Sequence, residues 1–301
     1  MGLVQGDLIE SGEGIMGAVE HVLAREPWVD SLQTYVKPYW DHLLQGPWAE
    51  GISRGELTLS EMQGWMLQIY PFIHAFPKFL AEALIKVEDD HSRAFFINNI
   101  RVEKAHAEHW LWMGEGFGLK RKEMLELADC SRPLLRDVQS LTDWLWYVNT
   151  KGSLAEAVAG TSFAIEGMAG DIARKITSGF QLYKDEPGVD LSPRTYRWMR
   201  EHATYDDEHP KIALQIVQRY ATNERMQTRV MLAAKRSLQL LDHALVTSFR
   251  AYSVAAPSDG ASDAERRGPD RRSAESRIAF PDRRFRERRG LGMDSLAALN
   301  Y

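Results

Sequence analysis

The pattern His-x-x-x-Asp-x-x-His at residues 202–209 constrains this chain more than any other feature of its sequence. An α-helix turns by about 100° per residue, so Asp206 and His209 lie within about 40° of His202 on one helical stripe. Imidazoles and a carboxylate on one face suit iron, manganese or zinc. A solvated polar face explains the same pattern, so a metal site is predicted only if other helices supply further ligands.

Helical periodicity also dominates the rest of the chain. No convincing strand and no internal repeat are present, and the connections are short, which predicts an all-α bundle. Capping-box sequences begin two of the expected helices, at Thr58–Glu61 and at Ser153–Glu156. The expected helices span residues 15–25, 29–44, 58–87, 90–116, 121–129, 134–148, 153–178, 192–220 and 223–251.

Prolines are expected to interrupt several of these helices. Pro38 falls inside the 29–44 segment, and Pro71 and Pro77 should bend or break the long apolar helix that follows Thr58. Pro210 has no N–H to donate and biases the preceding residue away from α geometry, which predicts a kink beside the 202–209 pattern.

Composition limits the class of protein. The 301 residues carry a formal charge of −5 and a single cysteine, Cys130, which excludes an intrachain disulfide and a thiolate metal cage. No apolar run is long enough for a membrane span, and no signal peptide is visible, so a cytoplasmic setting is the default expectation. The net charge gives no reason to expect nucleic-acid binding by the core.

The composition changes near residue 255, which predicts a helical domain over 1–254 and a separate tail over 255–301. From residue 254 onward there are ten arginines and eight acidic residues with few large apolar ones, so the tail is expected to be disordered and solubilising. An electrostatic contact with an acidic partner, RNA or an anionic membrane is the alternative, and the interspersed acids weaken it.

Two other segments supply candidate ligands. Glu103 and His106 are three residues apart and share a helical face, whereas His109 is rotated by about 240° from Glu103 and should point elsewhere. Glu166 lies among small residues at helical spacing, and a glutamate in such apolar company should be paired or metal-bound. His74, between two phenylalanines, is a candidate pocket residue, although a packed core histidine is favoured.

The predicted ligand set thus has three carboxylates and three imidazoles: Glu103, His106, Glu166, His202, Asp206 and His209. Two ferrous ions would carry four positive charges against three negative ones. The site would therefore favour an anionic substrate group, and six ligands on two metals leave positions open for dioxygen.

At these residues the chain resembles the haem-oxygenase-like diiron oxidases, over roughly residues 15–250. The three matching segments are Asn99-Ile-Arg-Val-Glu103-x-x-His106-x-x-x-Trp110, Ala164-Ile-Glu166-Gly-x-x-Gly170 and His202-Ala-x-Tyr-Asp206-Asp207-x-His209-Pro210. The resemblance implies a haem-oxygenase-like (TenA-like) fold, a labile Fe(II) pair, dioxygen as co-substrate, and the six ligands above as the catalytic metal site.

Within that family the residues are most similar to those of the decarboxylases that make 1-undecene from a medium-chain fatty acid. The substrate would then be an aliphatic carboxylate, held in a channel formed around Tyr39, Trp40, Tyr70, Phe72 and Phe76. Other oxidases of this fold oxygenate nitrogen, cleave amino-acid side chains, or make p-aminobenzoate from a protein tyrosine. The tail after residue 255 has no counterpart in the decarboxylases.

Two other functions remain open from the sequence. A cofactorless relative, such as a thiaminase-like hydrolase, would need Cys130 as its nucleophile, and Cys130 falls in an interhelical connection far along the chain from Glu166. A non-enzymatic regulatory protein would use the same scaffold with the tail as its contact arm. The sequence also leaves open an external electron donor, the tail's partner and a homodimer.

Overall fold

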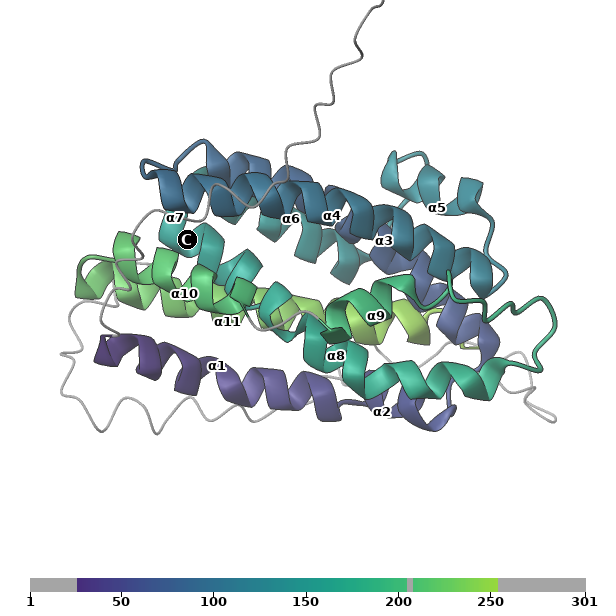
Figure 1. The fold of residues 1–301 in the computed structure, drawn as a ribbon. Helices are drawn as coiled ribbons and strands as arrows, with labels where there is room; N and C mark the ends of the chain where they lie inside the picture. Colours follow the sequence, from purple (N-terminus) through teal and green to yellow (C-terminus); the bar gives the residue numbers. More distant parts are fainter. Residues whose placement is uncertain (1–25, 205–207, 254–301) are drawn as a thin grey trace, which may run out of the picture.

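A computed structural model describes residues 26–204 and 208–253, which form helices joined by short connections (Figure 1). These residues contain no strand, which confirms the predicted all-α bundle. The elements are α1 (Pro27–Gln45), α2 (Pro47–Arg54), α3 (Leu59–Leu84), α4 (Asp90–Gly116), α5 (Arg121–Ala128), α6 (Arg136–Lys151), α7 (Leu154–Val158), η1 (Ala159–Phe163), η2 (Glu166–Met168), α8 (Ala169–Ile176), η3 (Thr177–Tyr183), α9 (Arg197–Thr204), α10 (Glu208–Tyr220) and α11 (Glu224–Arg250).

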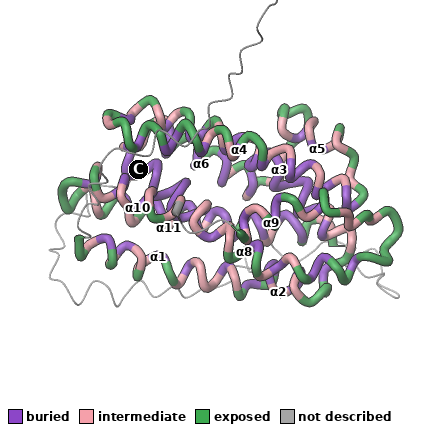
Figure 2. The backbone as a smooth tube through the Cα atoms, in the orientation of Figure 1, coloured by how far each residue is buried: buried purple, intermediate pink, exposed green. Residues whose placement is uncertain are grey.

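The helices pack around one apolar core (Figure 2). Helix α3 lies along α4, and α11 packs against α1, α3 and α6. Helix α9 bridges α4 and α8, so it joins the two sides of the bundle. None of the helices in the described residues combines the length and the hydropathy needed to cross a bilayer.

Both predicted capping boxes are present. The Thr58 hydroxyl accepts a hydrogen bond from the Glu61 N–H (3.2 Å), and the Glu61 carboxylate accepts one from the Thr58 N–H (2.7 Å). Ser153 and Glu156 make the same reciprocal pair at the start of α7. Each box satisfies backbone donors that a helix start leaves without intrahelical partners.

The predicted interruption of α1 at Pro38 and a break of α3 at Pro71 or Pro77 are wrong, while a bend of α3 at these residues stays a prediction. Helix α1 continues through Pro38, and α3 continues through Pro71 and Pro77 as a single helix of 26 residues. A proline inside a helix costs about 3 kcal/mol or more. Sixteen residues of α3 are buried between α4, α6 and α11, and this burial outweighs the local cost.

The segment expected as one helix from Ser153 to Ser178 is instead divided into α7, a π-helical turn η1, a 3-10 turn η2 and α8. In η1 the Ala164 N–H donates to the Ala159 carbonyl oxygen at 3.0 Å, five residues back. A Cβ on Gly160 would lie 2.8 Å from the Ser237 hydroxyl, so glycine allows η1 to approach α11 closely. The expected helix at 15–25 and the 255–301 tail lie outside the described residues.

Candidate metal centre

One face of α4 carries the first two candidate ligands. Glu103 and His106 are 6% and 3% exposed, and the His106 Nδ1 atom lies 2.9 Å from the Glu103 Oε1 atom. Their three-residue spacing places them on the same helical face. Burial opposes protonation of His106, but the carboxylates of Glu103, Glu201 and Glu166 together outweigh burial and raise the pKa of the imidazole.

Helix α9 brings His202 to this pair. Its Nδ1 atom lies 2.9 Å from the Trp198 carbonyl oxygen, and its ring centroid is 4.2 Å from that of His106. Burial, reinforced by the neighbouring His106, lowers the pKa of His202 well below its ordinary value. A neutral imidazole that donates Nδ1–H to a carbonyl oxygen presents its Nε2 lone pair as a ligand.

Glu103, His106 and His202 thus form a group that can hold a metal ion. One ligand atom from each residue lies within 4.8 Å of the corresponding atoms of the other two, and all three side chains are buried.

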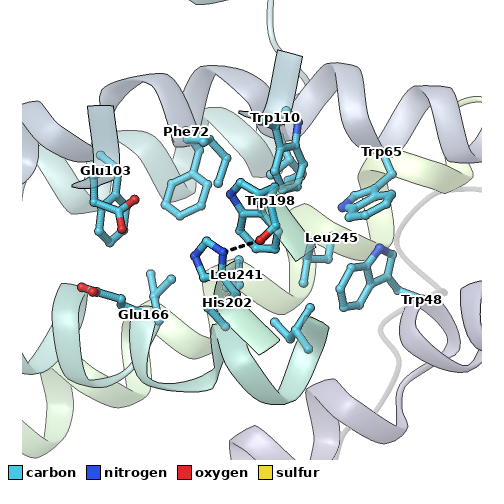
Figure 3. A pocket seen from close by; sticks show the side chains of 16 residues that line it. Trp48, Trp65, Phe72, Glu103, Trp110, Glu166, Trp198, His202, Leu241 and Leu245 are labelled. Atoms are coloured by element: carbon cyan, nitrogen blue, oxygen red, sulfur yellow. Dashed lines mark hydrogen bonds between the residues drawn. The ribbon is translucent and has the colours of Figure 1, made fainter. Parts of the chain in front are cut away.

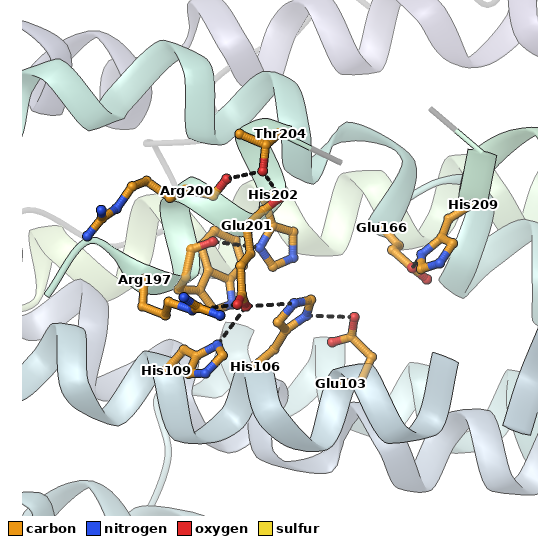
Figure 4. A network of polar contacts seen from close by, with 11 residues as sticks. Glu103, His106, His109, Glu166, Arg197, Arg200, Glu201, His202, Thr204 and His209 are labelled. Carbon is orange, nitrogen blue, oxygen red and sulfur yellow. Dashed lines mark hydrogen bonds and ion pairs between the residues drawn. The ribbon is translucent and has the colours of Figure 1, made fainter. Parts of the chain in front are cut away.

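Glu166 and His209 form a second group beside the first (Figure 4). The His209 Nδ1 atom lies 2.9 Å from Glu166 Oε1, and the Asn99 amide donates to both Glu166 oxygens at 3.1 and 3.0 Å. Burial raises the pKa of Glu166, and the negative charge of Glu103 adds to the increase, while His209 and Asn99 oppose it.

These donors fit a cation. Glu103 and Glu166 are two buried carboxylates, and the repulsion between them is relieved by any positive charge that they share. Three imidazoles complete a nitrogen and oxygen donor set that suits iron. The structure therefore places five of the six predicted ligands in two adjacent groups, and the sixth, Asp206, lies outside the described residues.

Residues 205–207, in the middle of the 202–209 pattern, lie outside the described residues, and so do the continuous helix and the kink that the sequence predicts there. His202 lies on α9, which is described to Thr204, and His209 lies on α10, which is described from Glu208. His202 faces Glu103 and His106, whereas His209 faces Glu166.

Three contacts around the centre were not found from the sequence. Asn99 contacts Glu166, and its spacing of four and seven residues before Glu103 and His106 was a usable signal. Trp198 stacks on His202 at 3.8 Å between ring centroids. Glu201 lies 2.7 Å from His109 Nδ1 and 3.6 Å from His106 Nε2, and nothing in the local pattern pointed to it.

His109 lies beside the candidate ligand group. It is absent from the candidate ligand group, as expected, but it is only 9% exposed, and Arg197 holds its partner Glu201 from the other side at 2.5 Å. Carboxylates of this kind orient metal-binding imidazoles.

An apolar pocket opens from the two glutamates into the bundle (Figure 3). It encloses about 610 Å³ of empty volume, including the part open to solvent. Glu103, Glu166 and His202 are its only polar or charged lining groups apart from tryptophan N–H groups, among the described residues. The other lining residues are Trp48, Trp65, Ile69, Phe72, Ile73, Phe76, Trp110, Ile165, Ala169, Ile172, Trp198, Leu241 and Leu245.

The predicted channel is only partly correct. Phe72 and Phe76 line the pocket, whereas Tyr39, Trp40 and Tyr70 do not. The Trp40 indole instead donates to the Ala164 carbonyl oxygen at 2.8 Å, which ties α1 to the segment that carries Glu166.

Two other candidate residues also lie outside the pocket lining. His74 is half-buried with its Nδ1 atom 3.4 Å from the Tyr70 hydroxyl, and Cys130 is exposed in the connection between α5 and α6.

Comparison with solved structures supports the fold. A TenA homologue from Pseudomonas syringae superposes with a TM-score of 0.66 at 21% identity, covering 74% of this chain and 93% of that one. A domain of unknown function with a heme oxygenase-like fold from Shewanella denitrificans gives a TM-score of 0.62 at 17% identity, with the same coverage. At these identities the likeness establishes the haem-oxygenase-like, TenA-like fold alone.

Comparison of sequences identifies relatives and a family in addition to the fold. The 4-aminobenzoate synthases of Chlamydia muridarum and Chlamydia trachomatis are each 26% identical to this chain over 174 residues. The aligned region covers 56% of this chain and 70% and 71% of those proteins. A family model described as iron-containing redox enzyme matches residues 63–242, which is more than half of the chain and includes both groups of the candidate centre. The chain therefore belongs to the family of iron-containing redox enzymes with this helical fold.

Proposed function

We propose that the protein is a non-haem diiron oxidase that uses dioxygen to oxidise an aliphatic carboxylate, with decarboxylation to a terminal alkene. The observation that carries the proposal is the shape of the pocket: a cluster of metal-ligand side chains at one end and an apolar, aromatic wall along the rest. Such a site suits a substrate with an acidic head and an apolar body.

Glu103, His106 and His202 would hold one iron, and Glu166 and His209 would hold the second together with Asp206. The iron pair would supply the binding and reduction of dioxygen. The chain's own contribution is to orient the ligands: Asn99 holds the Glu166 carboxylate, Trp198 fixes the His202 tautomer, and Glu201 faces His106 and His109.

The overall reaction sets a further requirement. Loss of CO2 and of one hydrogen from the β-carbon converts the acid to an alkene and releases two electrons and two protons. Reduction of dioxygen to two waters consumes four electrons and four protons. An external donor must therefore supply the other two electrons and two protons. The apolar lining would keep bulk water away from the reacting carbon.

Oxidation of an amino-acid or nitrogen-containing substrate, including 4-aminobenzoate formation, is the second candidate, and the similarity to the two chlamydial 4-aminobenzoate synthases favours it. If the ring came from a tyrosine of the protein itself, that tyrosine would have to face the pocket. None of the lining residues in the described structure is a tyrosine, and Tyr205, next to the candidate ligand Asp206, lies outside the described residues.

The decisive experiment loads the full-length protein with Fe(II) under argon, measures bound iron, and then adds oxygen and a panel of medium-chain fatty acids. We expect two irons per chain, a transient visible absorption and a terminal alkene detected by gas chromatography. His202→Ala should lose iron and the absorption, whereas His91→Ala, an exposed histidine on the same helix as His106, should keep both.

The possible results separate the candidate functions. Iron binding without alkene from any acid would shift the assignment to amino-acid or nitrogen substrates. An absorption that survives in His202→Ala would show that the ligand assignment is wrong. Failure to bind iron at all would favour a non-enzymatic relative.

A further inference from the structure

Three tryptophans in the pocket wall have indole N–H groups without an acceptor in the described structure. Trp48, Trp65 and Trp198 are 2%, 1% and 7% exposed, and the Nε1 atom of each is buried with no hydrogen-bond partner among the described residues. All three line the same pocket.

Other tryptophans show that the fold can satisfy such groups. Trp110, also in the pocket wall, donates to the Met66 carbonyl oxygen at 2.9 Å, and Trp144 donates to the Ser237 hydroxyl at 2.8 Å. A buried indole N–H normally has a partner, and leaving one unsatisfied is costly. Each Nε1 atom is itself buried, so an acceptor from a bound molecule would satisfy these donors once the indole edges turn toward the pocket that the three residues line.

Trp48 and Trp65 lie together at the end of the pocket opposite Glu103 and Glu166 (Figure 3). Their rings meet edge to face, with centroids 5.4 Å apart and an interplanar angle of 65°. An N–H over an aromatic face is a weak, second-order interaction, so this contact does not replace a hydrogen bond to oxygen.

We propose that Trp48 and Trp65 form a donor subsite for a neutral oxygen acceptor at the far end of the substrate, such as a hydroxyl or a ketone or ester carbonyl. This inference rests on the proposed function, in which the acidic head lies at the glutamate end. It narrows the substrate from a plain fatty acid to an acid with an oxygen function near its other terminus.

A second carboxylate does not suit this end of the pocket. No lysine or arginine is among the lining residues of the described structure, and the only titratable lining groups are Glu103, Glu166 and His202. Transfer of a charged group out of water without a counter-charge is strongly disfavoured. A neutral acceptor loses much less hydration free energy, and hydrogen bonds from the indole donors compensate for that loss.

The test measures binding, not turnover. The full-length, Fe(II)-loaded protein is titrated by calorimetry under argon with ω-hydroxy acids and with methyl-ended acids of equal heavy-atom count, over a range of medium chain lengths. We expect the ω-hydroxy acid of the best-fitting length to bind about tenfold more tightly than its methyl-ended counterpart.

Substitutions then assign that preference to the two indoles. Trp48→Phe and Trp65→Phe should each reduce the ratio of the two affinities toward one. The ratio is used because a smaller ring also leaves a cavity that weakens both ligands alike. Trp110→Phe is the matched control, since its N–H already serves Met66, and it should keep the ratio. Replacing Trp65 with benzothienylalanine removes the N–H while keeping the shape, should a phenylalanine variant fail to fold.

Each outcome decides. Equal affinities in the unaltered protein would overturn the subsite, whether or not alkenes are formed. The subsite would also be overturned if the preference for the ω-hydroxy acid survived both substitutions. Tighter binding of the ω-carboxylate than of the ω-hydroxy acid, or no binding of any acid, would overturn it as well. Alkene formation is scored separately. A preference for the ω-hydroxy acid without alkene formation would support the subsite and contradict the proposed decarboxylation.

Discussion

Replacement of Asn99 tests whether Glu166 belongs to a metal centre. Asn99 is fully buried, its amide nitrogen lies 3.1 and 3.0 Å from the two Glu166 oxygens, and its Oδ1 atom has no partner among the described residues. Asn99→Leu therefore removes the contact with Glu166 and no other hydrogen bond that the structure shows. A hydrogen bond to a charged group contributes about 1.5–3 kcal/mol. Loss of a residue that orients a ligand typically lowers metal affinity about 10–100-fold, which is about 1.4–2.8 kcal/mol.

The two magnitudes agree, so we expect the Fe(II) affinity of Asn99→Leu to fall about 10–100-fold while the metal-free protein stays folded. The affinity is measured under argon by competition with a chromogenic chelator, and the stability by urea unfolding. Asn149→Leu is the matched control. Asn149 is equally buried but donates to the Leu145 carbonyl and the Thr161 hydroxyl, so that variant should lose stability and keep its iron affinity. Unchanged iron binding in Asn99→Leu would refute the assignment of Glu166.

Three further substitutions test the packing and charges that hold the bundle together. Gly160→Ala should lower the free energy of unfolding by about 1–3 kcal/mol, measured in urea, because the new methyl would meet the Ser237 hydroxyl; the loss should shrink in a Ser237→Ala background. Lys86→Met should cost about 1–2 kcal/mol in the same assay, since the Lys86 ammonium donates to two carbonyl oxygens at the end of α6; an unchanged midpoint would contradict this. Burial raises the pKa of Asp242 despite the nearby His42. The protonated carboxyl group therefore favours the folded protein below the pKa of the unfolded chain, and this contribution to stability is lost as the pH rises through the pKa of the folded state. Asp242→Asn should therefore be more stable than the unaltered protein at neutral pH, with no advantage in strong acid.

The sequence predicted the parts of the molecule in which local and tertiary preferences agree. Helix α4 has the bounds expected from periodicity, Asp90–Gly116, and both capping boxes form as expected. Glu103 and His106 share a face because α4 is a regular helix, and the same regularity turned His109 away from them. For these residues, spacing along the chain translates directly into position.

Predictions failed where packing decides the outcome. Local chemistry argues against a continuous α3 through Pro71 and Pro77, but the burial of most of that helix supplies more free energy than the prolines cost. The pocket wall also depends on tertiary contacts. Trp48 on α2 and Leu245 on α11 both line the pocket, although almost two hundred residues separate them along the chain. A local sequence pattern cannot predict that two such distant residues line the same pocket.

The backbone around Glu166 differs from the regular helix that the sequence predicted there. Ser162 and Phe163 are buried, and η1, which holds them, packs against α10 and α11, so that face of the segment is committed to the core. In a regular α-helix Glu166 would follow Ser162 by four residues and share that face. The π-helical turn η1 adds a residue to the helical repeat, which rotates the later residues of the segment by about 100°, and the 3-10 turn η2 then begins at Glu166 itself. The carboxylate reaches Asn99 and His209 because the helix is irregular there, and a 3.6-residue periodicity cannot reveal that irregularity.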